Sequence, residues 1–130
     1  HSVMGTRHAG LAAFDPAALA EYERCIRLPG SARGMCGDYR ASAGIDLAHD
    51  RADVAAGRKI AMPLRVLWGD HGIVGKCFDV LALWRERADE VSGRRLACGH
   101  YIAEEAPADL LAEANLFFRS ERPWVKSASR

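Results

Sequence analysis

The 130-residue sequence lacks several features that would have assigned it to a whole class of proteins. It has no apolar run near the ~18–20 residues that a membrane-spanning helix needs. Its first ten residues contain no apolar stretch of the kind found in a signal peptide. Lysine and arginine are scattered and the formal net charge is only +1, so the sequence predicts no basic face for nucleic acid or anionic lipid. We therefore expect no nucleic-acid partner and no membrane association.

The four cysteines carry no metal-binding pattern. Cys25, Cys36, Cys77 and Cys98 are spread along the chain without the CxxC pairs typical of a zinc site. We expect reduced thiols that behave as small hydrophobic side chains, which favours a cytoplasmic location, and we expect no metal ion or organic cofactor. With 49% hydrophobic and 27% charged residues, the composition is that of one ordinary globular domain.

The first half of the chain is predicted to be helical. Asp15 followed by Pro16 is a typical helix start, because the aspartate caps free N–H groups and proline needs none. Ser31 is expected to cap a second helix. The buried face of that second helix would contain Met35, Cys36, Tyr39 and Ala43. A short third helix is expected over residues 50–56.

The second half alternates between strands and helices. Short strands are expected over residues 63–69 and 94–98, and helices over residues 76–88 and 107–119. The last helix is expected to bury a stripe of Leu110, Leu111, Ala114, Phe117 and Phe118. This order is typical of an α/β fold with a parallel sheet covered on both faces. Two strands leave an open edge, so we expect a homo-oligomer or association with a missing N-terminal half.

Chemistry is expected in the loops after the two strands, because ligands of open α/β sheets bind beyond the carboxyl ends of the strands. The first loop contains Asp70 and His71, and the second contains His100. Imidazole titrates near neutral pH, so His100 is either an acid–base catalyst or a structural histidine that hydrogen-bonds the strand end. His71 fits a solvated turn residue better. Glu104 and Glu105 are expected to favour the N-terminus of the last helix.

A series of short motifs runs through the chain. They are Asp38-Tyr39-Arg40-Ala41, Ile45-Asp46-Leu47, His49-Asp50, Pro63-Leu64, Trp68-Gly69, Val74-Gly75, Phe78-Asp79 and Gly99-His100-Tyr101-Ile102-Ala103-Glu104-Glu105. In this order and spacing, from about Phe14 to about Phe118, they resemble the haloacetate (fluoroacetate) dehalogenases of the α/β-hydrolase superfamily. The resemblance implies an α/β-hydrolase core with a helical cap domain inserted before the last strands. Residues 1–57 would then be the end of the cap domain, and residues 58–130 the last two strand–helix units of the core.

In that family an aspartate displaces the halide to form an ester, and a histidine activates water to hydrolyse the ester. The resemblance implies that His100 is this general base. It also implies that Tyr39, in the cap domain, donates a hydrogen bond to the leaving halide. The implied substrate is a small halogenated carboxylate.

The chain departs from the family pattern at two places. No Gly-x-[Ser/Asp/Cys]-x-Gly turn that could carry the nucleophile occurs in the sequence, so this chain alone is expected to be inactive. Gly37 stands where the family commonly has glutamate, and a glycine costs a helix about 1 kcal/mol relative to alanine. The helix that carries Tyr39 would therefore be loosened. The family's triad acid also lies upstream, which leaves Asp70 as a candidate acid beside its simpler reading as a solvated turn residue.

Two other functions remain open. An epoxide hydrolase shares the aspartate–histidine chemistry and uses tyrosines of the cap domain to protonate the opening ring. Two such donors would favour it, but only Tyr39 lies on a matching motif and Tyr22 does not. The missing nucleophile also fits a non-catalytic fragment that acts as an interaction module. An in-frame Gly-x-Asp-x-Gly upstream would favour an enzyme.

Overall fold

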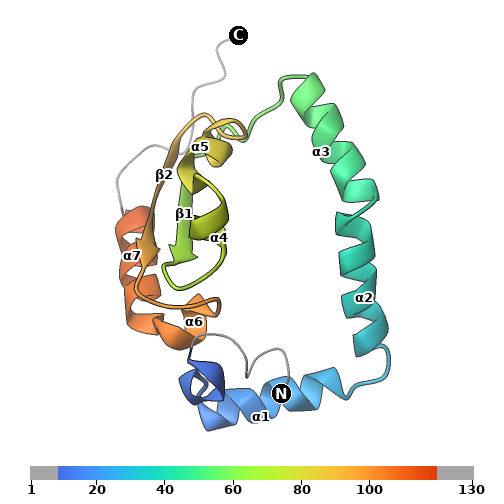
Figure 1. Ribbon diagram of the computed structural model, residues 1–130, viewed down its shortest axis with the longest axis vertical. Coiled ribbons are helices and arrows are strands. Elements are labelled where there is room, and N and C mark those ends of the chain that lie inside the picture. Colours follow the sequence, from blue (N-terminus) through green and yellow to red (C-terminus); the bar gives the residue numbers. More distant parts are fainter. Residues whose placement is uncertain (1–8, 120–130) are drawn as a thin grey trace. The chain divides into compact units, whose positions relative to one another are not determined.

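The computed structural model describes residues 9–119, and its contacts divide the chain into two compact units (Figure 1). The helical unit is Phe14–Lys59, and the sheet unit is Ile60–Arg130 together with His1–Ala13. The short 3-10 helix η2, Gly10–Ala13, belongs to the sheet unit. None of the helices in the described part of the chain is long and apolar enough to cross a membrane.

The helical unit consists of α1 (Pro16–Ile26), α2 (Ser31–Ser42) and α3 (Ile45–Ala55). The predicted cap of the first helix is confirmed. The Asp15 carboxylate accepts hydrogen bonds from the amides of Ala17 at 2.8 Å and Ala18 at 3.1 Å. These two bonds satisfy N–H groups that have no partner inside the helix. α3 begins at Ile45 rather than at residue 50, directly after Gly44.

The start of α2 differs from the prediction. Its N-cap is Gly30, whose φ of 88° lies in the left-handed region that favours glycine. Ser31 is the first residue of the helix, and its hydroxyl donates to the carbonyl oxygen of Cys25 at 2.8 Å. The predicted Ser31 cap is therefore wrong, and the hydroxyl ties the start of α2 to the end of α1.

The expected buried face of α2 is also wrong. Met35 is 52% exposed and Tyr39 is 78% exposed. Neither α1, α2 nor α3 contains a buried residue. Each helix packs mainly against the next one along the chain, and three helices in such a series cannot enclose one another's apolar side chains.

The sheet unit contains two parallel strands, β1 (Leu64–Gly69) and β2 (Val91–Leu96). The predicted parallel pair is confirmed, with Leu64 opposite Val91 and Gly69 opposite Leu96. β2 begins and ends earlier than predicted. It stops at Leu96, whose carbonyl accepts the amide of Cys98 at 2.8 Å in a tight turn.

The connection between the strands is two short helices rather than the single helix predicted over residues 76–88. α4 (Val74–Cys77) ends at Phe78, which has extended backbone angles of φ −137° and ψ 145°. Asp79 then caps α5 (Val80–Arg85) by accepting the amide of Ala82 at 3.0 Å. A capping aspartate in the middle of an apolar helical pattern marks a new helix start.

After β2 the chain forms α6 (Ile102–Glu105) and α7 (Pro107–Arg119). α7 lies on one side of the strand pair, and α4 and α5 lie on the other (Figure 1). The core on the α7 side consists of Leu96, Cys98 and Ala106, with Leu67 and Ile102 packed against it. The covering of both strand faces by helices is what the α/β prediction required.

The predicted stripe on α7 is only partly correct. Leu110, Ala114 and Phe117 are half-buried, but Leu111 and Phe118 are exposed. The buried side chain of α7 is instead Glu113. Its carboxylate accepts hydrogen bonds from Arg94 of β2 at 2.6 Å and from Arg65 of β1 at 2.9 Å. Hydrogen bonds from Arg94 and Arg65 lower the pKa of the Glu113 carboxyl. An ionic contact therefore joins α7 to both strands, where an apolar stripe was expected.

Candidate active site

The carboxyl ends of the two strands lie side by side. Gly69, the last residue of β1, pairs with Leu96 of β2 and is buried. A Cβ atom added at Gly69 would come within 1.7 Å of the carbonyl oxygen of Gly99. Real Cβ atoms do not approach a backbone oxygen so closely, so this contact requires glycine. The backbones that follow the two strands are thereby brought together.

Hydrogen bonds join the two loops as well. The amide of His71 donates to the carbonyl oxygen of Cys98 at 3.0 Å, and the amide of Asp70 donates to that of Leu96 at 2.9 Å. The structure thus brings the loop with Asp70 and His71 against the loop with His100. This is the edge at which ligands of open α/β sheets bind.

His100 lies in the second loop with an exposed side chain. Its ring packs edge-on against the ring of Tyr101, with centroids 5.0 Å apart and an interplanar angle of 80°. An exposed imidazole at the end of a parallel strand can exchange protons with water or a bound ligand. This exposed placement fits an acid–base role for His100, which stays a prediction.

Glu105 holds the backbone on both sides of His100. Its Oε2 accepts the amide of Gly99 at 2.6 Å, and its Oε1 accepts the amide of Tyr101 at 3.0 Å. Sequence reasoning expected Glu105 only to favour the N-terminus of the last helix. The available signal was a carboxylate shortly after a helix start, since such a residue can reach back to amides that precede the helix.

Asp70, the candidate acid, is exposed and faces an arginine. Its Oδ1 lies 3.7 Å from Nη1 of Arg95. Within the described chain it makes no hydrogen bond to His100. Asp70 as the partner of His100 therefore stays a prediction.

Cys98 is the thiol nearest to His100 in sequence, and its environment makes it a poor nucleophile. The residue is only 1% exposed. Burial raises the pKa of the Cys98 thiol, and the charges of Glu105, Asp109 and Asp70 raise it further. Because the thiolate is the reactive form, Cys98 does not replace the nucleophile that the sequence lacks.

Tyr39, the predicted leaving-group donor, belongs to the helical unit, whereas His100 belongs to the sheet unit. Tyr39 is exposed on α2, as a residue that contacts a ligand from outside the helix would be. Its role stays a prediction.

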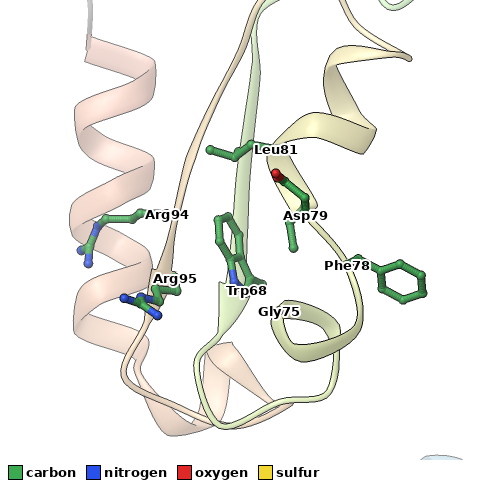
Figure 2. A pocket seen from close by; sticks show the side chains of 8 residues that line it. Trp68, Gly75, Phe78, Asp79, Leu81, Arg94 and Arg95 are labelled. Atoms are coloured by element: carbon green, nitrogen blue, oxygen red, sulfur yellow. The ribbon is translucent and has the colours of Figure 1, made fainter.

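A groove lies on the α4–α5 side of the strands (Figure 2). Its volume is about 390 Å³, and its lining includes Trp68, Leu81 and Arg95. Neither His100 nor Asp70 is among the described residues that line it. The groove is therefore separate from the two loops at the strand ends. Among residues 9–119, no group of three or more histidine, cysteine, aspartate or glutamate side chains is arranged to hold a metal ion.

Comparison with known proteins places this geometry in a fold family. No family model matches the chain. Over 128 residues, 98% of its length, the chain is 29% identical to a fluoroacetate dehalogenase from Burkholderia sp., of which it covers 41%. Over 107 residues, 81% of its length, it is 34% identical to a soluble epoxide hydrolase from Corynebacterium sp. strain C12, of which it covers 35%.

Comparison with solved structures points to the same fold. A protein from Nostoc sp. PCC 7120, provisionally assigned as an α/β-hydrolase, matches with a TM-score of 0.79 and 50% identity over 84% of this chain and 37% of its own. The chain thus spans less than half the length of each of these three proteins. It has the fold of the C-terminal part of an α/β-hydrolase.

Proposed function

We propose that this chain is the C-terminal part of a hydrolase in which His100 is the general base. One observation carries the proposal: His100 is exposed in the loop at the carboxyl end of β2, with its flanking amides held by Glu105. A general base must stand where water and substrate can reach it, and its backbone must be fixed. The similarity to two hydrolases over most of this chain supports the same reading.

The reaction we propose is the hydrolytic removal of halide from a small 2-halocarboxylate. An aspartate outside these 130 residues attacks the carbon that bears the halogen, a carbon–oxygen ester bond forms, and the carbon–halogen bond breaks. His100 then takes a proton from water, whose oxygen attacks the ester carbonyl. The 2-hydroxycarboxylate leaves and the aspartate is restored. No group outside the protein other than water and the substrate is needed.

Tyr39 is proposed to donate a hydrogen bond to the departing halide. Fluoride is a poor leaving group, so a donor aimed at the charge that develops on it lowers the barrier. The similarity to the fluoroacetate dehalogenase supports this substrate class because it extends over 98% of the chain.

Epoxide hydrolysis is the second candidate. The aspartate would attack one epoxide carbon and form an ester as the ring carbon–oxygen bond breaks, and a tyrosine would protonate the ring oxygen, which stays on the neighbouring carbon. Water activated by His100 would then hydrolyse the ester and release the diol. The higher identity to the soluble epoxide hydrolase, 34%, favours it, although over a shorter part of the chain. The two candidates share the role of His100 and differ in what Tyr39 protonates or binds.

The test uses the protein encoded by the whole open reading frame that contains this chain. We would measure halide release from fluoroacetate and chloroacetate with an ion electrode, and diol formation from a terminal epoxide by chromatography. His100→Ala should lower the preferred activity by about 10³-fold or more. His49→Ala, which removes another exposed histidine, is the matched control and should leave it unchanged.

Each result decides between the readings. Halide release that depends on His100 supports the dehalogenase, and diol formation that depends on His100 supports the epoxide hydrolase. If the folded protein shows neither activity, the reading that remains is the non-catalytic interaction module. The 130-residue chain alone should release no halide, and light scattering should find it self-associated unless its missing partner segment is added.

A further inference from the structure

We infer that Glu105 is the residue that positions His100, through the backbone on both sides of it. The Glu105 carboxylate accepts hydrogen bonds from the amide of Gly99 at 2.6 Å and from the amide of Tyr101 at 3.0 Å. These two residues lie directly before and directly after His100, and we call this pair of hydrogen bonds the clamp. The catalytic role of the clamp rests on the proposed function. The two hydrogen bonds themselves are independent of what the protein catalyses.

The clamp uses both oxygens of the carboxylate, one on each amide. Hydrogen bonds to an ionised acceptor are roughly twice as strong as those between neutral groups. The carbonyl of Tyr101 in turn accepts the amides of Glu104 at 3.0 Å and Glu105 at 2.8 Å. Hydrogen bonds therefore link the loop to the first turn of α6 on both sides of His100, and we expect them to restrict the backbone of His100.

Apolar packing of the residues around Glu105 holds the clamp against the core of the sheet unit. Ile102 and Ala106, on either side of Glu105 in the chain, pack with Leu96 and Cys98 in the core of the sheet unit. Glu105 is half-buried, and its charge is felt by the buried Cys98 thiol. A carboxylate that is partly withdrawn from water is costly unless its oxygens find donors. The two loop amides supply them.

These hydrogen bonds distinguish the role of Glu105 from that of the acid in a catalytic triad. A triad acid would accept a hydrogen bond from the imidazole itself, whereas the hydrogen bonds found for the Glu105 carboxylate within residues 9–119 come from the backbone amides of Gly99 and Tyr101. Glu105 therefore acts on His100 through the loop. The His100 ring also packs edge-on against the ring of Tyr101, with centroids 5.0 Å apart. Removal of Glu105 should thus misplace the base and leave the groups that bind the substrate intact.

The experiment compares three changes at Glu105 in the protein from the whole open reading frame. Glu105→Ala removes both acceptors, Glu105→Gln keeps one acceptor oxygen, and Glu105→Asp keeps the charge but shortens the reach. Glu104→Gln is the matched control, because it removes the same charge one residue away without removing the acceptor of the two loop amides. Glu113→Gln is the structural control, because it weakens the attachment of α7 without touching the loop.

Two readouts do not depend on activity. Hydrogen exchange at the amides of Gly99 and Tyr101 should accelerate at least about tenfold in Glu105→Ala, and less in Glu105→Gln. The nuclear Overhauser contact between the rings of His100 and Tyr101 should weaken in the same order. Both should be unchanged in the two controls. Unchanged exchange in Glu105→Ala would overturn the inference whatever the protein catalyses.

The third readout is kinetic. Glu105→Ala should lower kcat about 10- to 100-fold with KM changed less than about threefold, because a small misplacement of a catalytic group costs rate rather than binding. Glu105→Gln should recover part of that loss. An equal fall of kcat in Glu113→Gln would show a merely structural effect and would sink the positioning role. If the parent protein shows no turnover, the proposed function fails, and the exchange and ring-contact readouts still decide the inference.

Discussion

The helical unit and the sheet unit are both built largely from short helices, but they are held together differently. In the sheet unit, Leu96 and Cys98 are each only 1% exposed beneath α6 and α7. In the helical unit α1, α2 and α3 bury no side chain. Phe14, which precedes α1, is 6% exposed and packs edge-on against Tyr22 with ring centroids 6.2 Å apart, and the ion pairs are exposed, as in Arg24–Glu21 at 2.7 Å. Exposed ion pairs contribute little to stability. Among residues 9–119, the cluster of buried hydrophobic residues lies in the sheet unit, so we expect apolar packing to stabilise this unit more than the helical unit.

The first way to test that comparison is to remove a leucine from each unit. Leu96→Ala should lower the free energy of unfolding by about 2–5 kcal/mol, because Leu96 is 1% exposed and its truncation leaves a cavity in the core with Cys98 and Ala106. Leu47→Ala, in α3, should cost less than about 1 kcal/mol because Leu47 is 38% exposed. Urea denaturation measures both. A cost at Leu47 equal to that at Leu96 would mean that in solution another surface covers the helical unit.

The second test concerns function on the helical side. Tyr39→Phe should lower the rate of halide release about 10- to 100-fold, since one hydrogen bond to a charged leaving group is worth about 1.5–3 kcal/mol. The loss should be greater with fluoroacetate than with chloroacetate, because fluoride needs the donor more. Tyr22→Phe, on α1, is the control. Equal losses at Tyr22 and Tyr39 with an epoxide substrate would instead support two donors and the epoxide hydrolase.

Features of both units could be predicted from the sequence. Local patterns were sufficient for elements decided by residues close in sequence, and the strand–helix–strand order was sufficient for the parallel pairing. The Asp15 cap, the strand that ends at Gly69, the parallel pairing and the helix from Pro107 were all predicted correctly. The resemblance of the motifs around Tyr39 and His100 also gave the α/β-hydrolase fold.

What could not be predicted depends on partners far along the chain. Glu113 is buried because Arg65 and Arg94, 48 and 19 residues away, converge on it. A helical pattern that contains a glutamate gives no sign of that. Met35 and Tyr39 have the spacing of a buried stripe, but spacing cannot say whether a covering surface exists. The hydrogen bonds from the amides of Gly99 and Tyr101 to Glu105 were missed because a carboxylate in the first turn of a helix can bind preceding amides, another side chain or water, and the residue pattern alone does not choose among these.

The third test addresses the ionic contact of Glu113, which joins α7 to both strands beside the half-buried Leu110, Ala114 and Phe117. Glu113→Gln should lower the free energy of unfolding by about 1–2 kcal/mol at pH 7, less than a fully buried pair because Arg94 is half-exposed. Hydrogen bonds from Arg94 and Arg65 lower the pKa of the Glu113 carboxyl in the folded chain. The stabilisation that the Glu113 carboxylate contributes is therefore present above the pKa of ~4.3 in the unfolded chain. It is lost as the pH falls through the lower pKa in the folded chain.

The difference between the parent protein and Glu113→Gln should accordingly shrink when the pH is lowered below about 4. Thermal melts across the pH range measure it. Glu86→Gln, which removes an exposed pair with Arg87 at 3.5 Å, is the control and should show no such trend. A constant difference between parent and Glu113→Gln at all pH values would mean that the carboxylate charge is not what holds α7.

The smallest expected effect compares the two capping aspartates, one in each unit. Asp15 caps α1 through two amides, and Asp79 caps α5 through one. Loss of a cap costs about 1 kcal/mol, or roughly a fivefold change in a local opening equilibrium.

An isolated helix shorter than about 12–15 residues is marginal in water, so the 11-residue α1, with no buried side chain, depends on its cap. Asp15→Ala should therefore speed hydrogen exchange along all of α1. α5 also buries Val80 beneath it, so Asp79→Ala should speed exchange mainly at its first turn. Exchange resolved by residue measures both, and faster exchange throughout α5 with α1 unaffected would reverse the order of stability inferred for the two units.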